Sequence, residues 1–292
     1  MATTTHITDN YLSTSNVLMS SAEIADRFVV DNQLYYSTDD KTTQLIDLSG
    51  NYDEGQFLGK TKLTQNNTRL INVGENWTSK ESSRAWYSVA MSSDGKYQTA
   101  VAKVLLNFGQ IYISSDYGNT WTPKESDREW QAVAMSSDGK YQTAGVENGQ
   151  LYVSNDYGNT WTPKESSRRW FSVAMSSDGK YQTAVVYSGG QIYISQDYGN
   201  NWTPKESNRF WDSVAMSSDG KYQTAVDYNN GQIYISQDYG NNWTPKESNR
   251  FWDSVAMSSD GKYQTAVDYN NGQIYISQDY GNNWTPKESN RF

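Results

Sequence analysis

A tryptophan-led segment that recurs along the chain limits the fold more than any other feature of this sequence. The segment begins at Trp86 and reads WYSVAMSSDGKYQTAV, and its counterparts begin at Trp130, Trp170, Trp211 and Trp252. The spacings are 44, 40, 41 and 41 residues, and residues 211–251 are identical to residues 252–292. A fixed period of this length is typical of solenoids and propellers, in which each repeat stacks on its neighbours.

Within one unit the pattern indicates four short strands and no helix. Three strands are expected at Trp211–Met216, Tyr222–Val226 and Gln232–Ser236, because short apolar or alternating runs lie between turn clusters rich in Asp, Asn and Gly. A short fourth strand is expected around Trp243 and Thr244, ended by Pro245. Four strands in about 41 residues, repeated, predict the blade of a β-propeller.

The expected fold class is therefore all-β, a propeller of four-stranded antiparallel blades, with six blades. Five clear repeats fill residues 86–292, and residues 28–85 are interpreted as a diverged blade, because Gln33–Asp39 resembles Gln232–Asp238. Residues 1–27 are interpreted as an N-terminal tail or attachment segment. The alternative makes all of residues 1–75 a separate attachment segment.

The third turn of each unit has the pattern Ser-x-Asp-x-Gly-x-x-Trp. Its aspartate, glycine and tryptophan are Asp116, Gly118, Trp121; Asp156, Gly158, Trp161; Asp197, Gly199, Trp202; Asp238, Gly240, Trp243; and Asp279, Gly281, Trp284. Five matches in register resemble the Asp-box, or BNR, repeat of sialidases, sortilin-type receptors and photosystem II assembly factors; very similar tandem repeats occur in proteins of large DNA viruses. The resemblance implies the fold and a structural role for this turn, and it implies no particular chemistry.

Composition and charge exclude several functions. The chain has no cysteine, and its one histidine, His6, lies in the polar N-terminal stretch. Disulfides, thiol catalysis and a Ser–His–Asp site in the repeats are thereby excluded, and no metal or cofactor is expected. The net charge of −9 opposes nucleic-acid binding, and no apolar run is long enough for a membrane helix.

An enzyme is not expected. Almost every Arg and Glu falls at a repeated position, whereas catalysis needs one asymmetric set of groups whose pKa values differ. The Arg-Ile-Pro motif that the family resemblance implies for a sialidase is absent, and Arg69-Leu70-Ile71 is a poor match. A sialidase-like glycoside hydrolase stays as the alternative, since two-carboxylate chemistry is compatible with the residue types.

The repeats differ mainly in two connections, which should emerge on one face of the blades. One is the connection to the next blade (127–129, 167–169, 208–210), and the other follows the second strand (102–108, 146–148, 187–189, 227–230). The candidate ligand-binding residues there are Arg128, Glu129, Arg168, Arg169, Arg209, Phe210, Asp227, Tyr228 and Arg250. Either this face recognises a partner, or exposed loops have simply diverged.

We therefore expect a non-catalytic module that presents a repetitive face to a protein or glycan partner. A structural or assembly-factor scaffold is a further alternative. No compartment is indicated by a signal peptide, and a virion or extracellular surface is compatible with the sequence.

Overall fold

The computed structural model describes residues 26–30, 33–37, 43–45, 78–103, 109–270 and 272–287. The chain divides into two compact units, Met1–Trp77 and Thr78–Phe292. Among the described residues all regular structure is β, and no helix occurs. The all-β prediction is therefore confirmed.

The first unit contains one antiparallel sheet of three strands, β1 (Asp26–Val30), β2 (Gln33–Ser37) and β3 (Thr43–Leu45). The expected sixth blade, residues 28–85, extends across the boundary between the two units, and most of it lies outside the described residues. It stays a prediction, as does the attachment role of residues 1–27.

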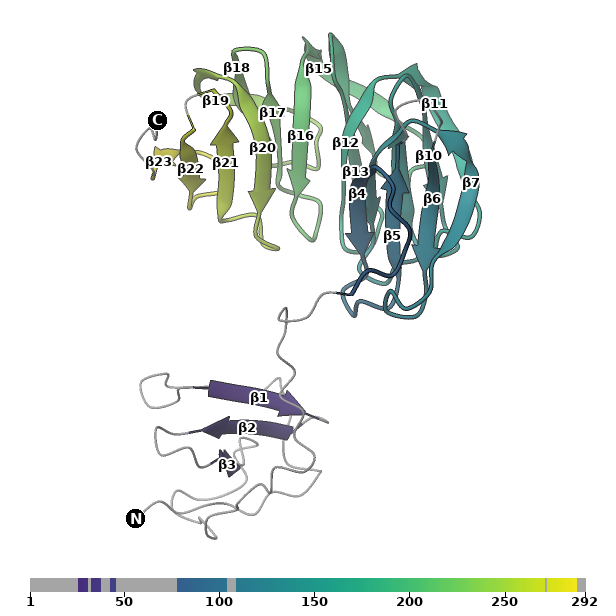
Figure 1. The fold of residues 1–292 in the computed structure, drawn as a ribbon. Helices are drawn as coiled ribbons and strands as arrows, with labels where there is room; N and C mark the ends of the chain where they lie inside the picture. The colour runs from purple at the N-terminus through teal and green to yellow at the C-terminus, as the bar shows by residue number, and fades with distance from the viewer. Residues whose placement is uncertain are drawn as a thin grey trace, which may run out of the picture. The chain divides into compact units, whose positions relative to one another are not determined.

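The second unit consists of five four-stranded antiparallel sheets, one for each sequence repeat (Figure 1). We number these blades first to fifth. The first blade contains β4 (Trp86–Met91), β5 (Gln98–Ala102), β6 (Gly109–Ser114) and β7 (Thr122–Arg128). The second contains β8 (Trp130–Met135), β9 (Gln142–Val146), β10 (Gly149–Ser154) and β11 (Thr162–Arg168).

The remaining three blades repeat this arrangement. The third contains β12 (Trp170–Met175), β13 (Gln182–Val186), β14 (Gly190–Ser195) and β15 (Thr203–Arg209). The fourth contains β16 (Trp211–Met216), β17 (Gln223–Asp227), β18 (Gly231–Ser236) and β19 (Thr244–Arg250). The fifth contains β20 (Trp252–Met257), β21 (Gln264–Asp268), β22 (Ile274–Ser277) and β23 (Thr285–Pro286).

Each blade is a meander in which strands pair in sequence order, and the opening strands β4, β8, β12, β16 and β20 lie beside one another in chain order. The opening strand is thus the inner one, and the fourth strand is the outer edge. These sheets have the blade architecture of a β-propeller.

The fourth strand is longer than the sequence suggested. It begins at Thr244, continues through Pro245 and ends at Arg250, whereas Trp243 lies in the preceding turn. The expectation that proline ends this strand was wrong, because β19 is an edge strand and an edge position tolerates a residue without an N–H.

The hydrophobic core lies between blades rather than within them. Trp211 of the fourth blade is fully buried and packs with Ile192 and Ile194 of the third. Its ring meets that of Tyr234 edge-on, with 5.0 Å between centroids. Equivalent clusters join the other consecutive pairs of blades. A blade therefore buries its apolar faces only by stacking on its neighbours.

Candidate functional site

Three variable positions of each repeat come together at one end of the blades. They are the residue before the opening tryptophan, the residue after it, and the residue that follows the second strand. The backbone holds two of them together, because the N–H of Tyr228 donates to the carbonyl of Phe210 at 2.9 Å. The same hydrogen bond recurs in the other four blades. The two variable connections therefore lie side by side, in agreement with the sequence-based expectation.

Aromatic side chains form a continuous row at this end in the third to fifth blades. Tyr187, Tyr228 and Tyr269 follow one another, one from each blade, with 6.3 Å and 5.9 Å between successive ring centroids. Phe171 stacks on Tyr187 at 4.9 Å, and Phe210 meets Tyr187 edge-on at 5.7 Å. Phe251 lies edge-on to Tyr228 at 6.0 Å. We call Phe171, Tyr187, Phe210, Tyr228, Phe251 and Tyr269 the aromatic row, and its last tyrosine is 67% exposed.

Two carboxyl groups accompany the aromatic row. Asp212 and Asp253 occupy the same position of the inner strands β16 and β20, directly after the opening tryptophans. Burial, followed by the negative charge of Asp253, raises the pKa of Asp212 to about 7. Both aspartates also contribute to the raised pKa of Tyr228, although burial is the main cause. The pair is thus electrostatically coupled to the tyrosines.

In the first three blades, some of the three variable positions carry charged side chains. Arg169 donates from Nε to Glu147 at 2.7 Å, and Lys103 pairs with the other carboxylate oxygen. Although burial opposes it, these two cations lower the pKa of Glu147. The Arg169 guanidinium also lies 4.7 Å from the ring centroid of Tyr187. These charged side chains meet the aromatic row at a shallow hollow of about 470 Å³, which is lined by Glu147, Arg169 and Tyr187 among others.

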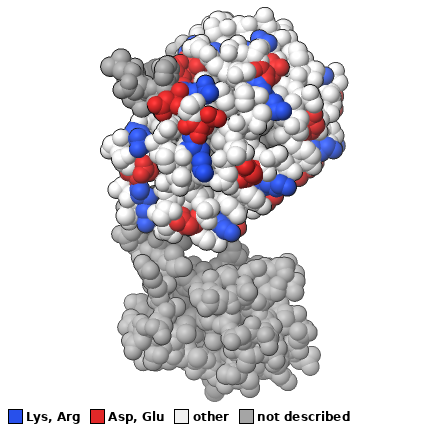
Figure 2. Space-filling view, turned by 90° about the vertical axis from the view of Figure 1, so that its right-hand side faces the viewer, with Lys and Arg blue, Asp and Glu red and all other residues white. Residues whose placement is uncertain are grey.

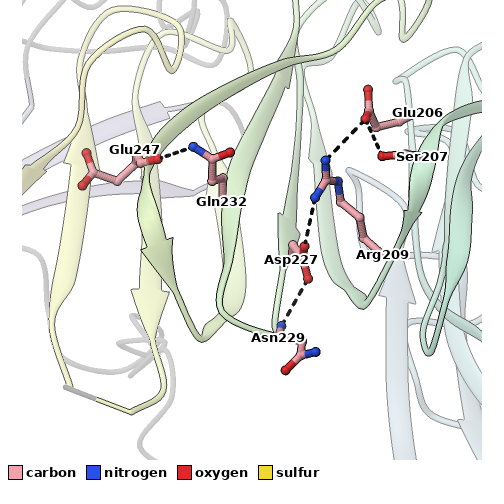
Figure 3. Close-up of polar contacts among 7 residues, drawn as sticks. All are labelled: Glu206, Ser207, Arg209, Asp227, Asn229, Gln232 and Glu247. Carbon is pink, nitrogen blue, oxygen red and sulfur yellow. Dashed lines mark hydrogen bonds and ion pairs between the residues drawn. The ribbon is translucent and has the colours of Figure 1, made fainter.

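Four of the arginines proposed as ligand contacts are packed against the next blade along the chain. The guanidiniums of Arg128, Arg168, Arg209 and Arg250 lie 4.6–4.8 Å from the ring centroids of third-strand tyrosines. Arg209 also reaches Asp227 at 3.8 Å and Glu206 at 3.9 Å (Figure 3). Asp227 is buried, which raises its pKa despite Arg209, and it accepts the Asn229 N–H at 3.2 Å. Except for the ion pair with Glu206, the arginine contacts join consecutive blades, and they fit a role in holding neighbouring blades together.

The candidate residues of the sequence analysis thus fall into two groups. Arg169, Phe210 and Tyr228 belong to the variable end, and Glu129 occupies the position equivalent to Phe210. The second group makes the arginine–tyrosine and ion-pair contacts just described, and it consists of Arg128, Arg168, Arg209, Arg250 and Asp227. Sequence reasoning missed Tyr187, Tyr269 and the Asp212–Asp253 pair. The signal was present, since the residue after the opening tryptophan reads Tyr, Gln, Phe, Asp and Asp along the five repeats.

The Ser-x-Asp-x-Gly-x-x-Trp turns are closed hydrogen-bonded units. Asp238 accepts the Asn242 N–H at 2.9 Å and the Ser236 hydroxyl at 2.8 Å, and Trp243 Nε1 donates to the Gly240 carbonyl at 2.9 Å. In the first blade, hydrogen bonds from Thr120 lower the pKa of Asp116 to about 2. Because the carboxylate is occupied by its own turn, we infer that these aspartates stabilise the turn.

The described residues contain no cluster of three or more His, Asp or Glu side chains suited to a metal ion. No described helix could span a membrane. The face shown in Figure 2 carries basic and acidic side chains intermixed, with no large area of one sign. Residues 104–108, which belong to the variable connection of the first blade, lie outside the described residues.

Neither a family model nor a curated protein matches this sequence. Solved structures with a similar fold include the GH74 xyloglucanase from Xanthomonas campestris, at 14% identity with a TM-score of 0.56. Another is the Niastella koreensis GH74 enzyme, at 18% identity with a TM-score of 0.59. In both cases the match covers 70% of this chain and 38% of the other. YCF48 from Cyanidioschyzon merolae matches at 15% identity with a TM-score of 0.49, over 72% of this chain and 88% of that one.

At such identities the GH74 structures establish the fold alone. The chain has a β-propeller fold, as the repeats predicted. It spans only about 38% of the length of those two enzymes.

The raised pKa of Asp212 predicts a specific pH dependence of stability. The ordinary value is 3.8 and the folded value about 7, so between these pH values the folded state keeps a proton that the unfolded state has lost. The contribution of Asp212 is therefore neutral below pH 3.8 and increasingly destabilising as pH rises to about 7. We expect Asp212→Asn to raise the melting temperature at pH 8 and to flatten its decline between pH 4 and 8. Asp127→Asn, at an exposed position of β7, is the control, and an unchanged slope in Asp212→Asn would contradict the assignment.

Proposed function

We propose that the second unit is a non-catalytic glycan-binding module whose ligand lies along the aromatic row. The observation that carries this proposal is the series Tyr187, Tyr228 and Tyr269, at centroid separations of 6.3 Å and 5.9 Å. Aromatic faces pack against the apolar faces of sugar rings, and tyrosine keeps a hydroxyl available for hydrogen bonding. One tyrosine from each blade would place successive contacts along a linear oligosaccharide.

The chemistry beside the row favours a neutral glycan. Two neighbouring carboxyl groups and a net charge of −9 would repel an acidic sugar such as a sialoside. With a pKa of about 7, Asp212 holds its proton in a large fraction of molecules near neutral pH. A protonated carboxyl group can donate a hydrogen bond to a sugar hydroxyl as well as accept one.

The expected binding is weak at each contact and accumulates along the row. Titration calorimetry with cellohexaose, a neutral linear hexasaccharide, tests this expectation. Tyr228→Ala should weaken binding about tenfold, the effect of losing one aromatic contact near the centre of the row. Tyr198→Ala is the matched control, because Tyr198 lies in a Ser-x-Asp-x-Gly-x-x-Trp turn, away from the row. Equal effects of both substitutions, or absence of binding to neutral hexasaccharides, would refute this function and favour a protein-binding scaffold.

Glycoside hydrolysis is the second candidate, and the Asp212–Asp253 pair is the observation that favours it. Glycosidases use two carboxyl groups whose pKa values differ, one as acid and one as base or nucleophile. If this reading holds, purified protein releases shorter sugars from cellohexaose, and Asp212→Asn and Asp253→Asn each abolish that release. Release of sialic acid from 3′-sialyllactose instead would favour a sialidase-like enzyme.

A further inference from the structure

The contact between consecutive blades is one pattern used four times. A threonine of each blade donates its hydroxyl to a buried glutamine of the next at 2.5–2.6 Å, as Thr224 does to Gln264. A serine N–H of each blade donates to a serine carbonyl of the next at 2.7–2.8 Å, as Ser218 does to Ser259. We call the surface that carries the threonine the trailing face and the surface that carries the glutamine the leading face.

Aromatic stacking follows the same repeat. A trailing-face tyrosine stacks on a leading-face tyrosine of the next blade, with centroids 4.5–4.6 Å apart, as in the pair Tyr222–Tyr280. At each junction the trailing-face tyrosine also covers a leading-face glycine, such as Gly261. The apolar core lies beside these contacts.

The first blade leaves part of its leading face exposed, although Arg84 lies 4.6 Å from the ring centroid of Tyr112, as the arginine of the preceding blade does at the other junctions. Val89 is 65% exposed and Trp86 39% exposed, whereas Val214 and Trp211, their counterparts in the fourth blade, are buried. Tyr117, which corresponds to Tyr280, is 62% exposed. No described residue donates to the Gln98 carbonyl oxygen in the way that Thr224 donates to Gln264.

The fifth blade leaves its trailing face uncovered in the same way. Tyr263, the counterpart of Tyr222, is 51% exposed, and Ile274, the counterpart of buried Ile233, is also exposed. Ala256 on the inner strand β20 is exposed as well. The trailing face of the fourth blade, which has the same sequence, contacts the leading face of the fifth in this structure.

We propose that copies of this chain associate head to tail, with the trailing face of the fifth blade of one copy on the leading face of the first blade of another. A second copy is the expected partner because the equivalent trailing and leading faces already bind each other within the chain, between the fourth and fifth blades. The first blade retains the residues needed, since Val89, Gly95 and Gln98 correspond to Val255, Gly261 and Gln264. Such an interface is heterologous, so it extends into open or closed arrays rather than stopping at a two-fold dimer.

Sedimentation velocity of the full 292-residue chain over a range of concentrations tests this proposal. We expect concentration-dependent association. Val89→Asp on the leading face and Ala256→Arg on the trailing face should each weaken self-association about 100-fold, because each places a charge in an apolar contact. Both sites are exposed in the single chain, so the melting temperature should change little. Ser126→Asp, on the exposed part of β7, is the control for added charge and should associate like the original chain.

Mixing the two variants provides the decisive result. Each variant keeps one intact face, so an equimolar mixture should form a 1:1 dimer and nothing larger. Self-association of either variant alone at the original strength would overturn the proposal, since it would indicate a two-fold contact. A monomer at every concentration would overturn it too, by indicating that another part of the same chain covers these faces.

Discussion

Replacing Trp211 with alanine is expected to lower the free energy of unfolding by about 3–5 kcal/mol, the usual cost of removing a large aromatic from a core. The Trp211 side chain is fully buried between the third and fourth blades, so its loss leaves a cavity lined by residues of both. Urea denaturation followed by circular dichroism measures the effect, and the midpoint should fall.

Trp86→Ala is the matched control for this prediction. Trp86 has the same position in its repeat, but it is 39% exposed and no described blade packs on its outer side. We expect a loss of about 1–2 kcal/mol, mainly from its edge-on contact with Tyr112. Both variants should be measured at concentrations where the chain does not associate. Equal losses at the two positions would show that blade stacking is not the main source of burial.

Gly220→Ala is expected to destabilise the protein by about 2–4 kcal/mol, the sum of backbone strain and a steric clash. Gly220 has φ of +80°, which disfavours any side chain, and an added Cβ would lie 2.6 Å from the Cβ of Tyr181 in the preceding blade. That contact is with an atom next to the backbone, so a change of rotamer cannot relieve it. The expected result is a lower melting temperature and a lower urea midpoint.

Gly189→Ala separates the two causes. Its φ of +79° is almost the same, but no heavy atom lies within 4 Å of the added Cβ. Only the conformational cost of about 1–2 kcal/mol should remain. If the two alanine variants lost the same stability, the close approach of the blades at Gly220 would carry no energetic weight.

The blades were predictable from the sequence because their determinants are local. The turn around Asp238 is closed by Ser236, Gly240 and Asn242, all within a few residues, and the period places Trp211 at the same point of every blade. The fourth strand was predicted too short because the sequence does not show that this strand pairs with a neighbouring strand on one side only. Pro245 is tolerated within the strand because it lies at this edge of the sheet.

The candidate site was predictable only in part. Sequence variation identified the two connections that the structure brings side by side, and it included Phe210, Tyr228 and Arg169. It could not show that Arg209 at the end of the third blade would lie over Tyr234 of the fourth. It also gave no indication of the pKa of Asp212, because that value depends on burial and on an aspartate 41 residues away that folding brings near. A pKa that depends on such distant residues can be predicted only when the arrangement of the blades is known.

The repeated junction also determines how a gene for such a chain can change. If unequal recombination removed one 41-residue unit, the trailing face of the third blade would meet a leading face of unchanged sequence, because residues 211–251 and 252–292 are identical. Gain of a unit would likewise create no new kind of junction. The number of tyrosines in the aromatic row, and with it the length of glycan that the proposed function would accommodate, could thus vary between descendants without any compensating substitution in the core.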